Sequence, residues 1–66
     1  RKKVVVVVKQ TTNISITPKQ VVIKNNVAYI YTTSVLKNVI QVNRSKILNT
    51  LYEELPKAQE TIRDIR

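Results

Sequence analysis

The most informative stretch of the chain is Gln20-Val21-Val22-Ile23-Lys24-Asn25-Asn26-Val27-Ala28-Tyr29-Ile30-Tyr31-Thr32. Two runs rich in β-branched and aromatic residues flank the Asn-Asn pair, and asparagine tolerates the left-handed backbone that a two-residue type I′ turn requires. The stretch therefore predicts an antiparallel hairpin. A two-residue loop also fixes the register, which places Lys24 opposite Val27 and Gln20 opposite Tyr31.

This register divides the hairpin into two unlike faces. One face carries only apolar side chains, namely Val21, Ile23, Ala28 and Ile30. The other face is mixed and carries Gln20, Val22, Lys24, Val27, Tyr29 and Tyr31. Antiparallel sheets commonly pack one face on a core and leave the other in water. We therefore expect the first face to be buried and the second to be a surface for binding.

Three other segments favour strands by composition. Val4 to Val8 is a run of valines, apolar on both faces, and predicts a central strand. Ile14 to Thr17 alternates and stops at Pro18, which suits an edge strand or a turn. Val39 to Val42 predicts a further antiparallel strand after a loop at 34–36. A helix over 35–42, capped by Thr33 or Ser34, is the alternative.

The C-terminal part has helical spacing. Ser45 is a good N-cap, and the apolar residues after it recur at helical intervals as Ile47, Leu48, Leu51, Tyr52 and Leu55. Pro56 ends or kinks this helix, or opens a second short one with Ala58, Ile62 and Ile65 on one stripe. The predicted fold is a single small α+β domain over 1–66. Its strand-rich part, 1–43, forms an antiparallel sheet of four to five strands, and 45–66 forms a C-terminal helix broken at Pro56.

The charges of the chain are unevenly distributed. The 66 residues include 12 Lys and Arg against 4 Asp and Glu, a formal net charge of +8. Glu53 is the first acidic residue, so residues 1–52 are neutral or basic throughout. A positive field without internal counter-charges attracts polyanions and steers their approach. The sequence thus predicts nucleic acid as the partner, DNA rather than RNA.

Several function classes are excluded by missing residue types. The chain has no Cys and no His, which removes disulfides, Cys/His zinc sites and imidazole catalysis. It has no Gly, which a P-loop requires. Glu53 and Glu54 are adjacent, so on a helix they point about 100° apart and form no paired-carboxylate site. We expect a non-enzymatic protein without cofactor or metal.

The expected location is the cytoplasm. Missing cysteines suit the cytoplasm, and no apolar run is long enough to span a membrane.

Two places are the best candidates for contacts with nucleic acid. Asn43 to Lys46 stands at the expected helix start, where free N–H groups and the positive dipole end suit a phosphate. Tyr29 shares a strand face with Lys24, and aromatic rings between cations can stack on bases. Alternatively, Tyr29 covers a half-buried sheet face or lies in a dimer interface. The predicted nucleic-acid-binding residues are Lys2, Lys3, Lys9, Lys24, Tyr29, Lys37, Asn43, Arg44, Ser45 and Lys46.

Two DNA-binding families resemble parts of the chain. Residues 43–55 resemble the second helix of ribbon-helix-helix repressors, which often begins with Arg-Ser. That resemblance implies a ribbon at 20–24 and a first helix within 27–42, although the usual turn glycine is missing. The strand order over 4–55 resembles the first two-thirds of a LytTR-type DNA-binding domain, and 62–66 loosely resembles its Arg-containing strand. Both resemblances imply DNA binding, and neither assigns a contact residue.

The sequence therefore predicts a small regulator or accessory factor that binds DNA. It would contact the phosphate backbone through a basic sheet face and a helix N-terminus. A homodimer is expected, because so short a chain buries only about 60% of its unfolded surface. One alternative is an interaction module, such as an inhibitor or assembly subunit, that docks an acidic protein partner. RNA binding is the other alternative. For any single lysine, the alternative to binding a polyanion is that it only keeps the protein soluble.

Overall fold

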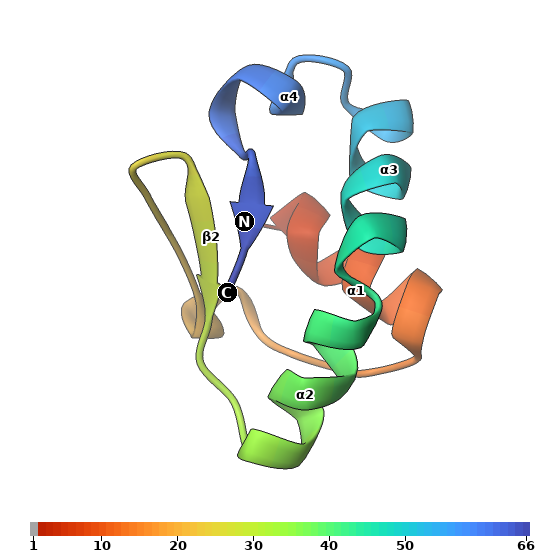
Figure 1. The fold of residues 1–66 in the computed structure, drawn as a ribbon, viewed down its shortest axis with the longest axis vertical. Helices are drawn as coiled ribbons and strands as arrows, with labels where there is room; N and C mark the ends of the chain where they lie inside the picture. Colours follow the sequence, from red (N-terminus) through yellow and green to blue (C-terminus); the bar gives the residue numbers. More distant parts are fainter. Residues whose placement is uncertain (1) are drawn as a thin grey trace.

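The computed structural model describes residues 2–66 and shows a small mixed sheet with helices packed on one side of it (Figure 1). Arg1 lies outside the described residues. The predicted α+β class holds only broadly, because the sheet has three strands, in the order β1-β2-β3, and is not antiparallel throughout. The predicted antiparallel sheet of four to five strands followed by a C-terminal helix is wrong. The elements are α1 (Lys2–Thr12), the 3-10 turn η1 (Pro18–Gln20), β1 (Val21–Lys24), β2 (Val27–Ile30), α2 (Ser34–Val42), α3 (Arg44–Glu54), α4 (Ala58–Thr61) and β3 (Asp64–Ile65).

The predicted hairpin is confirmed, with its register. β1 and β2 pair antiparallel with Lys24 opposite Val27, and the loop residues Asn25 and Asn26 have φ angles of 53° and 65°. The predicted core face is also confirmed, because three of its four residues are buried and Ile23 is half-buried. Asparagine at both left-handed positions explains why the turn needs no glycine.

β3 extends this hairpin in a way that the sequence analysis missed. It pairs parallel to β2, with Ala28 opposite Ile65. The Arg63 N–H donates to the Asn26 carbonyl at 2.7 Å, and the Arg66 N–H donates to the Ala28 carbonyl at 2.8 Å. The helical stripe predicted for residues 58–65 is therefore wrong beyond Thr61. A strand of two residues is too short to show an alternating pattern in the sequence.

The valine run forms helix α1 and not the predicted central strand. Val4, Val7 and Val8 are buried on one side, and α1 packs mainly against α3. Val6, on the opposite side, is 43% exposed. Consecutive valines fit every periodicity, so only their β-branched character favoured a strand. Intrinsic propensity is a weak term that tertiary burial overrides.

The connector after α1 is also not a strand. Asn13 has a φ of 63°, and its N–H donates to the Lys9 carbonyl at 2.9 Å, which closes the helix. Ile16 then enters the core, and Pro18 opens η1. The alternation over 14–17 reflects one buried residue in an extended connector, so the predicted strand there is wrong.

Residues 34–42 form α2, so the helical alternative is correct and the strand prediction is wrong. Thr33 caps this helix, because its Oγ1 accepts a hydrogen bond from the Leu36 N–H at 3.3 Å. Ile40 is the buried residue of this helix. With helices at both 2–12 and 34–42, the description of 1–43 as strand-rich is wrong as well.

Helix α3 begins earlier than predicted and ends where predicted. Asn43, and not Ser45, is its N-cap residue, and the helix stops at Glu54, shortly before Pro56. Ile47 and Leu51 are buried against the core. α4 follows the proline, and Tyr52 Oη donates to the Ile62 carbonyl at 2.7 Å, which fastens α3 to the segment leading into β3.

A single core joins all these elements. α1, α2, α3, α4 and all three strands contribute at least one buried apolar residue to it. Figure 1 shows α1, α2 and α3 on the same side of the hairpin, so the opposite face of the sheet is left without a helical cover. Within residues 2–66 no helix is both long and apolar enough to cross a bilayer.

Candidate nucleic-acid interface

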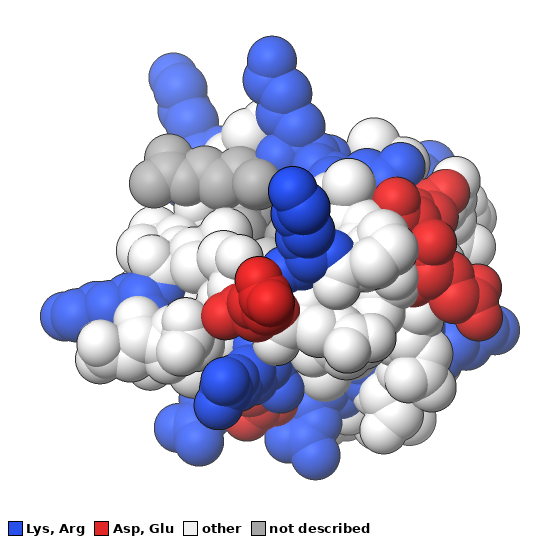
Figure 2. Space-filling view, turned by 90° about the horizontal axis from the view of Figure 1, so that it is seen from above, with Lys and Arg blue, Asp and Glu red and all other residues white. Residues whose placement is uncertain are grey.

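Lysine and arginine side chains are spread around the molecule and do not form one continuous patch. Figure 2 shows them projecting on every side of the face seen from above, with acidic groups between some of them. Over the described part of the chain two acids account for all the ion pairs. Lys3 Nζ lies 3.1 Å from Glu54 Oε2, Arg44 lies 3.3 Å from Asp64, and Arg66 lies 3.5 Å from Asp64. Most of the cations in residues 2–66 are thus left without an acidic partner.

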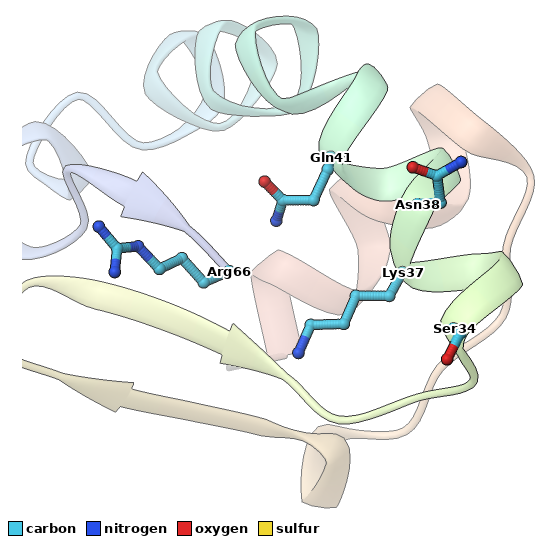
Figure 3. Close-up of a pocket in the computed structure, with 5 residues that line it drawn as sticks. All are labelled: Ser34, Lys37, Asn38, Gln41 and Arg66. Atoms are coloured by element: carbon cyan, nitrogen blue, oxygen red, sulfur yellow. The ribbon is translucent and has the colours of Figure 1, made fainter.

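One groove brings basic and polar side chains together. It lies between α2 and the end of the chain and has a volume of about 400 Å³ (Figure 3). Four of its lining residues lie on one face of α2, because their spacing is i, i+3, i+4, i+7. The fifth follows β3. The lining residues are Ser34, Lys37, Asn38, Gln41 and Arg66, and we call this site the α2–β3 groove.

Hydrogen bonds hold the two walls of the α2–β3 groove together. Gln41 Nε2 on α2 donates to the Ile65 carbonyl on β3 at 3.0 Å. On the other wall, the Arg66 backbone is tied to Ala28 of β2. The side chains of Lys37 and Arg66 therefore extend from walls that are linked to each other and to the sheet (Figure 3).

The groove is electropositive. Each of its five lining residues carries an N–H or O–H donor, and none of them is acidic. Lys37 takes part in none of the ion pairs found in residues 2–66. Asp64 is the acid that lies next to the groove, and its two oxygens are divided between Arg44 and Arg66. This corner of the molecule therefore has three cationic side chains against one side-chain carboxylate.

Of the ten predicted binding residues, Lys37 and Arg44 lie in this corner. Lys37 lines the groove, and Arg44 reaches it through Asp64. The predicted anchor at the start of α3 is altered, because the side chain of the N-cap residue Asn43 makes no capping hydrogen bond to α3 and instead donates from Nδ2 to the Val39 carbonyl at 2.9 Å. Ser45 and Lys46 are exposed in the first turn of α3.

The other predicted residues lie on different elements. Lys2, Lys3 and Lys9 belong to α1, where the Lys3 ammonium is already paired with Glu54. Lys24 is exposed and Tyr29 is half-buried, and both lie on the sheet face opposite the core. The ten residues are therefore divided among α1, the hairpin and the α2–α3 region.

Sequence reasoning missed four of the five groove residues. Ser34, Asn38 and Gln41 share the helical spacing of Lys37, and this spacing becomes visible once 34–42 is taken as a helix. Arg66 gave no such signal. Its position depends on the parallel pairing of β3 with β2, which joins residues far apart in the chain.

Comparison with protein-family models, with curated protein sequences and with solved structures found no match.

The resemblances to ribbon-helix-helix repressors and to LytTR-type domains also disagree with the fold. A ribbon-helix-helix arrangement would need a helix from residue 27, where β2 lies. A LytTR-type strand order would need a strand at the valine run, where α1 lies. The candidate interface therefore rests on the side chains of this structure alone.

Proposed function

We propose that this chain binds nucleic acid, with DNA as the first candidate, and catalyses no reaction. The observation that carries the proposal is the uncompensated positive charge, which includes a groove lined by hydrogen-bond donors and by no acid. Lys and Arg side chains bind phosphate groups, and phosphate contacts dominate protein–DNA affinity. The α2–β3 groove and Arg44 form the centre of the proposed interface.

The proposed role is that of a small regulator or accessory factor in the cytoplasm, acting as a homodimer. Exposed lysines such as Lys24 and Lys46 add to the positive field around the interface. Tyr29 offers only part of its ring, because it is half-buried. Its proposed contact is therefore with a sugar or a base edge.

Docking to an acidic protein is the second candidate function. One observation favours it specifically: Val35 and Val42 are 75% and 79% exposed on α2, on the side next to the cationic groove. Exposed apolar side chains beside positive charge suit a partner surface that combines apolar and acidic residues. RNA binding remains the third candidate.

The test is a binding titration against labelled duplex DNA, single-stranded DNA and RNA at two salt concentrations. With about four phosphate contacts, affinity for duplex DNA should fall about a hundredfold between roughly 50 and 200 mM salt. The tightest of the three ligands identifies the class of nucleic acid. Absence of salt-sensitive binding to all three would contradict the proposal and leave the acidic-protein alternative.

A further inference from the structure

We infer that the α2–β3 groove holds a short stretch of sugar–phosphate backbone, with one phosphate at Lys37 and the next at Arg66. This inference rests on the proposed nucleic-acid binding and specifies which part of the ligand the groove takes. The groove volume of about 400 Å³ exceeds what one phosphate fills, so there is room for the sugar between two phosphates.

The two cations are arranged along the groove and do not converge on one point. Figure 3 shows Lys37 reaching from α2 toward the end of the chain, while the Arg66 side chain runs on in the direction away from Lys37. Two separated positive groups in one open groove match the repeating charge of a nucleic-acid strand. A single small anion would be better served by cations that point at each other.

Each cation keeps donors free for a phosphate. The Lys37 ammonium has no ion-pair partner among residues 2–66. Arg66 lies against Asp64 through Nε, at 3.5 Å, and the terminal guanidinium nitrogens of Arg66 donate none of the side-chain hydrogen bonds found in residues 2–66. Those nitrogens are the ones that bind phosphate side by side. Ser34, in the first turn of α2, adds a hydroxyl at the positive end of the helix dipole.

The test compares the groove cations with matched cations elsewhere. K37Q, R66Q and the double variant are titrated with duplex DNA over a salt series. K19Q and K57Q serve as controls, because Lys19 and Lys57 are exposed, line no part of this groove and form none of the described ion pairs. All four substituted positions keep a polar side chain, so the change is one of charge.

We expect each groove variant to lose about tenfold in affinity and to flatten the slope of log K against log salt by about 0.9. The double variant should lose about a hundredfold and about 1.8 in slope, because separate phosphates give additive effects. Losses of affinity no larger than those of K19Q and K57Q would overturn the inference that the groove binds the sugar–phosphate backbone. A double variant no weaker than either single variant would overturn the two-phosphate arrangement.

A second measurement separates failure of this inference from failure of the proposed function. Backbone amide shifts are followed by NMR during titration with a 5′-phosphorylated thymidine dinucleotide, which carries two phosphates, and with inorganic phosphate. Stronger binding of the dinucleotide, with shifts centred on residues 34–41 and Arg66, supports the groove even if long duplex DNA fails to bind. If the wild-type chain binds DNA but the groove amides do not shift, the groove is not the binding site. The proposed function would then still stand.

Discussion

Asp64 places one carboxylate between two guanidinium groups. Its Oδ1 lies 3.3 Å from Arg44 and also accepts the Ile65 N–H at 2.8 Å, while its Oδ2 lies 3.5 Å from Arg66. Any phosphate that approaches either arginine must compete with this carboxylate. Both arginines are largely exposed, so the ion pairs add little to stability and act mainly on the local potential.

Replacing Asp64 by Asn should therefore tighten DNA binding. We expect D64N to gain about threefold to tenfold in affinity, because two guanidinium groups are released beside the groove while the Asn oxygen can still accept the Ile65 N–H. The measurement is the dissociation constant for duplex DNA at moderate salt. E60Q is the control, because Glu60 changes the net charge equally and lies in none of the described ion pairs. Equal gains in the two variants would show that only net charge matters.

At the scale of elements, α2 shows how one helix serves three environments. Ile40 faces the core, the half-buried Leu36 lies on the same side of the helix, and Ser34, Lys37 and Gln41 face the groove. A third stripe, with Val35, Val39 and Val42, is exposed to solvent. These three stripes lie about 120° apart at the helical period. The packing of Ile40 therefore decides that the groove face points at β3.

α1 allows a direct test of the helical assignment of the valine run. Val7 is fully buried and its neighbour Val6 is 43% exposed. Changing Val7 to Ala should lower the free energy of unfolding by about 1–3 kcal/mol, because buried methyl groups are lost. Changing Val6 to Ala should alter it by less than about 0.5 kcal/mol, since alanine favours helix and little burial is lost. Urea denaturation measures both values, and similar losses in the two variants would be inconsistent with one buried face at this position.

At the scale of the whole molecule, the net charge of +8 acts on folding as well as on binding. Like charges repel one another more strongly in the compact state than in the extended chain, and salt screens that repulsion. The three partly exposed ion pairs found in residues 2–66 are too weak to offset it. The same salt that weakens DNA binding should therefore stabilise the free protein.

The expected result is a melting temperature that rises by a few degrees between about 20 and 200 mM sodium chloride. Thermal unfolding followed by circular dichroism measures it. The D64N and E60Q variants, each one charge more positive, should show a steeper rise. A melting temperature that falls with salt would mean that attractive pairs outweigh the general repulsion.

Local patterns carried enough information for part of this fold. The Asn25-Asn26 turn and its flanking strands were predictable with their register, because backbone sterics within a few residues select that conformation. The end of α3 before Pro56 was predictable for the same reason. Lys37 and Arg44 were among the candidate binding residues, Lys37 as a loop cation of the acid-free segment and Arg44 as part of the expected helix start.

By itself, the sequence determined the hairpin, its buried face, the end of α3 and the excess of positive charge. All of these follow from short-range sterics or from the count of charged residues. Only the tertiary structure decided that the valine run is a helix, that β3 pairs parallel to β2, and that Gln41 and Arg66 line one groove with Lys37. The reason is physical. The burial of Val7 against α3 and the pairing of Ile65 with Ala28 join distant residues, and such contacts override the weak local preferences of the chain.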